Sequence, residues 1–265
     1  MDHKKTVMPV LFIGHGTPMN AIENNKFSLE WKKLGATLPR PKAILCISAH
    51  WETEGTQTSA TNTPKTIHDF GGFPRELYNQ QYPAPGSSEL ADTISNKLDK
   101  YFIERDYIRG LDHGAWSFLK HMYPEANIPV VQLSIDYTQD MQFHYNLGKE
   151  LLFLREAGVL IIGSGNMVHN LMLARQGENG FNTEFAYDWA TDMNEQLKEK
   201  ILLGDHHSLI HYERIPNARL GIPSEEHYIP LIYALALQTE EDKISIFNDK
   251  VVGGSIAMTS LVIGR

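Results

Sequence analysis

The chain has 265 residues, of which 42% are hydrophobic and 21% charged, and its net charge is −8 at pH 7. This length and composition are typical of a globular protein, and the acidic balance argues against a nucleic-acid binder, which usually has a basic surface. Cys46 is the only cysteine, which excludes intramolecular disulfides and cysteine-based zinc sites and favours a reducing cytoplasm. No segment approaches the roughly 18 apolar residues of a membrane span, so we expect a cytoplasmic protein.

Short apolar runs along the chain are typical of buried strands in a parallel sheet. They lie at residues 10–13, 43–48, 129–135, 159–162 and 256–263. Segments with helical periodicity lie between them, at residues 89–99, 142–156, 182–203 and 228–237. This alternation predicts an α/β fold, with a mixed, largely parallel central sheet flanked by helices. We find no linker or repeat, so residues 1–265 are expected to form a single domain.

Residues 53–86 differ from the rest because glycine and proline are frequent there. The stretch also contains the aromatic residues Phe70, Phe73, Tyr78 and Tyr82. A long loop in a compact domain often has a function, such as that of a lid. A surface loop with its own small hydrophobic cluster fits the same pattern, and both interpretations stay open.

Three histidines follow three of the expected strands. His15 comes after residues 10–13, His50 after residues 43–48, and His169 after residues 159–162. Ligands collect at the carboxyl ends of parallel strands, so the recurrence predicts a metal site there, although each histidine alone would more often only donate or accept a hydrogen bond. Imidazole is a good ligand for zinc, iron, copper and nickel, so the ligand type does not identify the metal.

Two further histidines are candidates with open alternatives. His227 lies near a helix-start signal, Ser224 followed by two glutamates, and both a metal ligand and ordinary acidic capping fit that position. His113 stands between glycines in a sequence that suggests a tight loop. There it would suit general acid–base chemistry, or it would be a turn residue bonded to the backbone.

A rival histidine cluster follows the expected helix at residues 182–203. His207 and His211 are four residues apart and could share a helical face, with His206 beside them. No glutamate lies inside this spacing, and the surroundings suggest an exposed loop, so we disfavour a metal there. The chain also lacks a glycine-rich phosphate loop, a dinucleotide fingerprint and a Gly-x-Ser-x-Gly nucleophile motif.

Taken together, seven stretches that span nearly the whole chain resemble the class III extradiol ring-cleavage dioxygenases. This is the superfamily of the protocatechuate 4,5-dioxygenase catalytic subunit, and the resemblance is strongest to its 4,5-DOPA extradiol dioxygenase group. The stretches are FIGHGTP at 12–18, ISAHW at 47–51, HDFGGFP at 68–74, YPAPG at 82–86, LDHGAW at 111–116, GSGNMVHN at 163–170 and EHYIP at 226–230.

The resemblance implies a mixed α/β fold with one divalent metal ion at one end of the sheet. It implies that His15, His50 and His227 are the metal ligands. It places His169 beside the metal, as a proton-transfer residue or a fourth ligand, and His113 toward the substrate as an acid–base residue. The implied partners are a small catechol such as DOPA and O₂, without nucleic acid, membrane or an obligate protein partner.

One feature departs from many ring-cleaving relatives, which use two histidines and a carboxylate as ligands. A neutral histidine at the third position, His227, raises the charge of the site by one unit. We therefore expect Zn²⁺ in the protein as isolated and Fe²⁺ for oxygen chemistry, because zinc has no redox chemistry. Trp51, Phe73 and Trp116 are the candidates for packing against the aromatic ring.

Two other functions fit the same histidines. A zinc-dependent hydrolase would use three histidines and a bound water, with His113 or His169 as the general base. A non-enzymatic binding protein would use the same fold for recognition only. The presence of all five histidines favours the dioxygenase over the binding protein.

Overall fold

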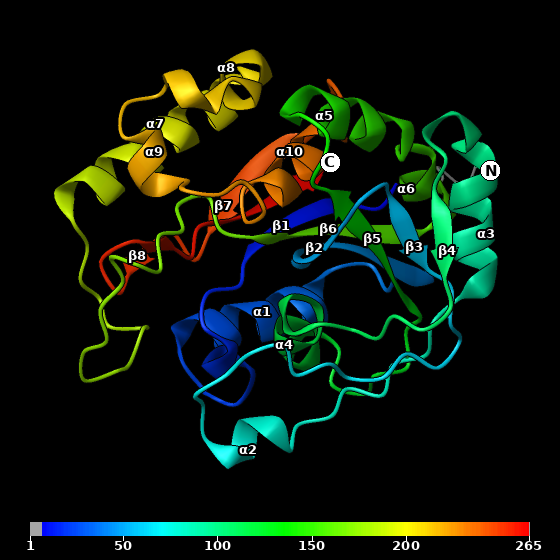
Figure 1. Cartoon of the computed structure of the whole chain (residues 1–265), viewed down its shortest axis with the longest axis horizontal. Helices are drawn as coiled ribbons and strands as arrows, with labels where there is room; N and C mark the ends of the chain where they lie inside the picture. The colour runs from blue at the N-terminus through cyan, green and yellow to red at the C-terminus, as the bar shows by residue number, and fades with distance from the viewer. Residues whose placement is uncertain (1–6, 265) are drawn as a thin grey trace.

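A computed structural model describes residues 7–264, and a central sheet of eight strands runs through them (Figure 1). These strands are β1 (Val10–Gly14), β2 (Ala43–Thr53), β3 (Gln57–Ser59), β4 (Glu104–Asp106), β5 (Val130–Asp136), β6 (Val159–Gly165), β7 (Lys243–Phe247) and β10 (Ser260–Gly264). A separate two-stranded sheet pairs β8 (Val251–Val252) with β9 (Ile256–Ala257).

The strand order is β4-β3-β5-β2-β6-β1-β10-β7. The four central strands β5, β2, β6 and β1 are all parallel, whereas β10 and β7 are antiparallel neighbours on one side and β3 is antiparallel to β5 on the other. The mixed, largely parallel sheet is therefore confirmed. The carboxyl ends of the central strands all lie at one edge of the sheet, which is where the histidines of interest are found.

Successive residues of each central strand face opposite sides of the sheet, as the pleat requires. In β6, for example, Val159 and Ile161 belong to one hydrophobic core, and Leu160 and Ile162 belong to the other. Both faces are therefore buried, which explains why these strands appear in the sequence as continuous apolar runs rather than as alternating ones.

Helices cover both faces of the sheet. The α-helices are α1 (Lys26–Thr37), α2 (Arg75–Tyr78), α3 (Ser88–Lys97), α4 (His113–Met122), α5 (Met141–Glu150), α6 (Phe153–Ala157), α7 (Asp188–Leu203), α8 (His206–Ile210), α9 (Ala218–Gly221) and α10 (Ile229–Ala236). Short 3-10 helices lie at η1 (Pro18–Ala21), η2 (Asp99–Tyr101) and η3 (Tyr212–Arg214).

Different helices cover the two faces of the sheet. Helices α5, α7 and α10 pack on one face, above the sheet in Figure 1, and every residue of α10 is buried. Helices α1 and α4 pack on the opposite face, where Trp31 of α1 and Trp116 of α4 are both fully buried. Among residues 7–264, no helix is both long and apolar enough to span a membrane.

Four expected elements have clearly different limits in the structure, and the strand expected at 43–48 extends to Thr53 as β2. The expected strand at 256–263 is divided into β9 and β10, which belong to different sheets. The expected helix at 142–156 is interrupted between α5 and α6 by a turn at Leu151 and Leu152, which hydrophobic periodicity cannot detect. The expected helix at 182–203 begins only at Asp188, because Tyr187 is extended and its N–H binds the Gly254 carbonyl.

The expected set of elements lacked α1 and α4. Helix α4 is almost wholly buried, and the glycines around its start made the sequence suggest a loop there. Its first residue is His113, and the side chain of Asp112 accepts a hydrogen bond from the Ala115 N–H as the N-cap. The prediction that His113 sits in a tight loop is therefore wrong, and the preceding aspartate is a helix-start signal.

Candidate metal centre

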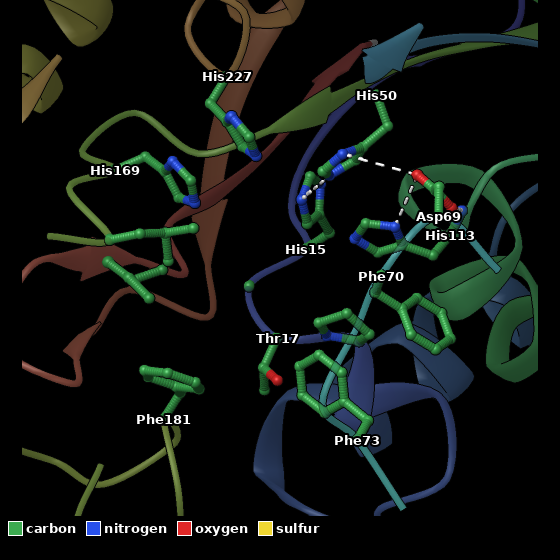
Figure 2. A pocket seen from close by; sticks show the side chains of 14 residues that line it. His15, Thr17, His50, Asp69, Phe70, Phe73, His113, His169, Phe181 and His227 are labelled. Atoms are coloured by element: carbon green, nitrogen blue, oxygen red, sulfur yellow. Dashed lines mark hydrogen bonds and ion pairs between the residues drawn. The ribbon is translucent and has the colours of Figure 1, made fainter. Parts of the chain in front are cut away.

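A pocket of about 310 Å³ opens at the carboxyl ends of the central strands. Figure 2 shows histidine rings gathered at one end of this pocket, with Phe73 and Phe181 at the other. The residues that line it are His15, Gly16, Thr17, Pro18, His50, Asp69, Phe70, Phe73, His113, His169, Leu171, Phe181, His227 and Ile256. All five histidines that the sequence singled out as metal ligands or catalytic residues therefore lie together.

Three of them form a group that could hold a metal ion. One ring nitrogen from each of His15, His50 and His227 lies within 4.8 Å of the others. The Nε2 atoms of His15 and His50 are 3.1 Å apart, so these two nitrogens point at the same space. Their separation in sequence is bridged by the parallel sheet, which brings β1 and β2 to either side of β6.

His15 directly follows β1, and its backbone N–H binds the Gly165 carbonyl at 3.1 Å. Its Nδ1 lies 3.0 Å from the Ser164 hydroxyl oxygen. That hydroxyl donates its only hydrogen to the Gly114 carbonyl, so its oxygen must accept a hydrogen bond from Nδ1–H of His15. This bond fixes the tautomer and leaves the lone pair on Nε2, the atom that faces His50.

His50 lies inside β2 rather than after it, because the strand continues to Thr53. The pairing of β2 with β5 shifts register between Ile47 and Glu52, and such an irregularity redirects the side chains within it. The guanidinium of Arg109 donates to the His50 carbonyl at 3.0 Å and holds this segment.

His227 lies in the turn that precedes α10, not at the first turn of a helix that starts at Ser224. Its carbonyl accepts a hydrogen bond from the Asn166 N–H at 2.9 Å, next to Gly165. A side chain at Gly165 would overlap that carbonyl, so only glycine allows this close approach to β6. The Glu226 carboxylate lies 3.0 Å from Nδ1 of His227, accepts its hydrogen and leaves Nε2 free.

Burial keeps these imidazoles neutral. It lowers the pKa of His50 to about 3 and, with help from neighbouring histidines, lowers the pKa of His15 and of His227 well below the ordinary value. A metal ligand must be an unprotonated imidazole, and carboxylate or hydroxyl partners on the outer nitrogen are typical of metal-binding histidines. The donor set therefore fits a divalent metal ion.

His169 lies at the edge of this group. Its ring stacks on that of His227, with centroids 3.6 Å apart and planes 11° from parallel. Burial lowers its pKa to about 4. His169 also forms a second group of possible ligands with Glu226 and His227. Its position beside the three histidines agrees with either role expected for it.

His113 faces the same space from the other side, with its ring centroid 3.9 Å from that of His50. Asp69, which the sequence analysis gave no role, contacts it directly. One Asp69 oxygen accepts a hydrogen bond from the His113 backbone N–H at 2.9 Å, and the other lies 3.0 Å from Nδ1. Burial would raise the pKa of Asp69, but the hydrogen bonds and charge of His113 outweigh it and lower the pKa to about 2.

A buried hydrogen-bond network around Asp112 holds the backbone segments that carry His50 and His113. The Asp112 carboxylate is fully buried and accepts hydrogen bonds from Arg109 at 2.8 Å, Gln132 at 2.7 Å and the Ser48 hydroxyl at 2.7 Å. Because Arg109 also binds the His50 carbonyl, one carboxylate connects the start of α4 to β2.

The aromatic candidates are only partly right. Phe73 lines the pocket as expected, together with Phe70 and Phe181, which were not singled out. Trp51 and Trp116 do not line it. Trp51 is buried beneath the guanidinium of Arg109, and Trp116 is fully buried with its indole N–H bound to the Ile67 carbonyl. Large apolar residues beside a site in sequence are often core residues.

The rival cluster does not form a comparable site. His206 and His207 lie in helix α8 rather than in an exposed loop, and His211 caps its end. Both ring nitrogens of His206 face protein partners, the Tyr145 hydroxyl at 2.9 Å and the Gln238 side-chain oxygen at 3.0 Å. Within residues 7–264, none of these histidines belongs to a group of three potential metal ligands.

Comparison with known proteins agrees with this arrangement. Residues 8–261 match the family described as the catalytic LigB subunit of aromatic ring-opening dioxygenase. The chain is 43% identical to a 4,5-DOPA dioxygenase extradiol of Escherichia coli K12, over 98% of this chain and 96% of that protein. It is 38% identical to the protein of the same name from Beta vulgaris, over 98% of each chain.

A solved structure shows the same fold. The crystal structure of an uncharacterized protein from Escherichia coli K12 superposes with a TM-score of 0.84 and 38% sequence identity, over 97% of this chain and all of that one. The family match covers almost the whole chain, and the curated relatives cover it at similar length. The chain therefore belongs to the LigB family of aromatic ring-opening dioxygenases and is an enzyme of the extradiol dioxygenase type.

Proposed function

We propose that the chain is a metal-dependent extradiol dioxygenase that opens the ring of a catechol such as DOPA with O₂, by 4,5-cleavage to seco-DOPA. The observation that carries this proposal is the convergence of three buried, neutral imidazoles at one end of an apolar pocket. The names of the relatives from Escherichia coli and Beta vulgaris support DOPA as the first substrate to test.

His15, His50 and His227 would hold the metal through the ring nitrogens that face one another, including the Nε2 atoms of His15 and His50, which lie 3.1 Å apart. Bound iron(II) would supply a chelating centre for the two catechol oxygens and the redox chemistry that makes O₂ reactive, which zinc lacks. Three neutral ligands leave the site one negative charge short of a two-histidine, one-carboxylate set. This supports zinc occupancy in the protein as isolated and Fe²⁺ as the working metal.

The pocket walls would bind the catechol ring and keep water away from it. Phe70 and Phe73 lie on one side and Phe181 on the other, and their rings form apolar walls beside the histidines. A volume of about 310 Å³ lies at the low end of the range for small-molecule pockets, which suits a single aromatic ring with a short substituent. Aromatic side chains pack on such a ring in stacked or edge-to-face geometry.

His113 and His169 would perform the proton transfers from opposite sides of the pocket. With the hydrogen of His113 on Nδ1 facing Asp69, its Nε2 can accept a proton from a catechol hydroxyl. His169, stacked against His227, can take part as a second proton-transfer residue or as a fourth ligand. The ring would open beside, not between, the two hydroxyl-bearing carbons, with both atoms of O₂ in the product.

The expected partners of the protein are small molecules only, a catechol and O₂. We propose a cytoplasmic location, because a single buried cysteine and the absence of disulfides suit a reducing compartment. The acidic net charge supports function without nucleic acid.

The proposal is tested by removing all metal with a chelator and reloading the protein anaerobically with iron(II) or zinc. Each form is then assayed for O₂ uptake with DOPA and a panel of other catechols. We expect uptake and a yellow product only with iron. An iron-loaded protein that consumes no O₂ with any catechol would contradict the proposal, and ester or amide hydrolysis by the zinc form would favour a hydrolase.

A further inference from the structure

Asp69 holds a position that the proposed chemistry does not yet use. It lies in the glycine- and proline-rich stretch at residues 53–86 and directly precedes Phe70, which lines the pocket. Figure 2 shows its carboxylate on the side of His113 that faces away from His169 and His227. The carboxylate thus lies behind the His113 ring, although Asp69 also lines the pocket and forms, with His50 and His113, another group that could hold a metal ion.

The contacts of Asp69 are divided between the backbone and the ring of one residue. Its Oδ1 accepts a hydrogen bond from the His113 N–H at 2.9 Å, and its Oδ2 lies 3.0 Å from His113 Nδ1. The distance from Oδ2 to Nδ1 of His50 is longer, at 3.7 Å. The ring of His113 is 5% exposed, and its buried Nδ1 makes no hydrogen bond of standard geometry with any described residue, so Asp69 Oδ2, at 3.0 Å, is a close contact rather than a formed hydrogen bond.

A carboxylate can only accept hydrogen bonds, so its contact with Nδ1 favours the tautomer that carries the hydrogen there. The lone pair is then on Nε2, the nitrogen available to a reactant. The same logic applies to His15 with Ser164 and to His227 with Glu226, but those two histidines face the metal group. The Asp69 contact favours one tautomer of His113, which is not among His15, His50 and His227 but does form another group of possible ligands with His50 and Asp69.

We propose that Asp69 is a positioning residue for ring opening, which acts through His113 by fixing the tautomer and orientation of its imidazole. Because Phe70 and Phe73 follow in the same loop, the residue also connects the aromatic wall of the pocket to the acid–base histidine. This inference rests on the proposed function. The alternative is that Asp69 only anchors its loop to the start of α4, without an effect on catalysis.

Asp69→Asn separates these possibilities better than alanine does. Its side-chain oxygen can still accept the hydrogen bond from the His113 backbone, so the anchor to α4 stays. Its amide group can no longer accept a hydrogen from Nδ1, and it favours the opposite tautomer by donating to that nitrogen. Asp99→Asn removes an exposed carboxylate outside the pocket and is the matched control.

The test is a double-mutant cycle with Asp69→Asn, His113→Ala and the combined variant, each loaded with iron(II). We expect Asp69→Asn to lower kcat for DOPA by about a hundredfold, the scale of general acid–base catalysis, while KM and metal content change less than about threefold. In the His113→Ala background the same substitution should have almost no further effect. Asp99→Asn should behave as the parent protein does.

A second measurement needs no turnover. Long-range ¹H–¹⁵N NMR spectra of the zinc-loaded protein, with His113 assigned by its alanine variant, report which ring nitrogen carries the hydrogen. We expect Nδ1 in the parent and a shift toward Nε2 in Asp69→Asn. If the parent cleaves no catechol, the proposed function fails, and these spectra still decide the role of Asp69. An unchanged tautomer, an unchanged kcat, or fully additive losses in the cycle would overturn the inference.

Discussion

Two groups of clustered histidines lie within residues 7–264, and of these only the group in the pocket has the properties of a metal site. In the pocket, outer nitrogens are held by Ser164 and Glu226, and the inner nitrogens converge. At helix α8, both nitrogens of His206 are used by protein partners, the ring of His207 lies 4.6 Å from that of His211, and Nδ1 of His211 is 3.8 Å from a Glu213 carboxylate oxygen. Proximity of histidines in sequence is thus a poorer guide than convergence of free lone pairs.

The difference has a simple physical origin. His15, His50 and His227 come from the end of β1, from β2 and from the turn before α10, and each makes a hydrogen bond, through its ring or its backbone, to a distant segment. His206 and His207 come from one short helix, which directs neighbouring side chains outward at different angles, and His206 is held by Tyr145 and Gln238. A metal site needs several rigid directions that meet at one point, and a parallel sheet supplies them at its carboxyl edge.

The largest effect should come from His15→Ala. The substitution removes a buried ligand, and we expect metal content and O₂ uptake to fall by more than about a hundredfold, beyond the loss typical of outer partners. Elemental analysis of the dialysed protein and an oxygen electrode measure both. Full metal content in this variant would break the distinction between the two clusters.

The next largest effect should be a loss of folding stability at low pH that is caused by the buried histidines of the pocket. The pKa of His50 is about 3 and that of His169 about 4, against about 6.5 in an unfolded chain. Below pH 6.5 the unfolded chain binds protons that the folded chain does not, so the metal-free protein should lose stability as pH falls toward 4. Each such histidine contributes about 1.4 kcal/mol per pH unit. Urea unfolding at several pH values should show a flatter dependence for His169→Gln; an identical slope would contradict it.

Ser164→Ala should weaken metal binding without abolishing it. The variant leaves the Nδ1 hydrogen of His15 unpaired, and loss of such a partner usually lowers metal affinity by about 10- to 100-fold. Competition with a zinc chelator of known affinity measures the change. Ser208→Ala, beside the rival cluster, is the control, and equal metal affinity in both variants would show that the contact with His15 is irrelevant.

His206→Ala should affect stability but not metal. Its ring joins Tyr145 and Gln238, and the loss of these partly buried hydrogen bonds should cost about 1–3 kcal/mol in the free energy of unfolding. Chemical unfolding reports the cost, and elemental analysis should show the metal content of the parent. A loss of bound metal would mean that the α8 cluster does contribute a site.

The smallest effect is expected for the double variant His207→Ala, His211→Ala. These residues are partly exposed, and surface substitutions of this kind usually change stability by less than about 0.5 kcal/mol each. Metal content and O₂ uptake should stay within about twofold of the parent. A clear drop in metal content or O₂ uptake would show that the histidines at α8 contribute to the metal site.

Several features could be predicted from sequence because they depend on local patterns. The strands β1, β2, β5 and β6 are continuous apolar runs, and their expected boundaries were close to the observed ones except at the end of β2, which extends to Thr53. Helix α4 was missed because the glycines around His113 suggested a loop, although Asp112 is a helix-start signal. Trp51 and Trp116 were misassigned to the pocket, since an aromatic residue next to a site in sequence can face the core instead.

The sequence by itself determined the α/β pattern, the histidines at strand ends and, through seven matching stretches, the family. The tertiary structure alone decided which nitrogens are free, because the groups that set each tautomer are often remote. Ser164 lies 149 residues from His15, and Asp69 lies 44 residues from His113. A strand end predicts where a side chain will lie, but its hydrogen-bond partners depend on how separate segments pack.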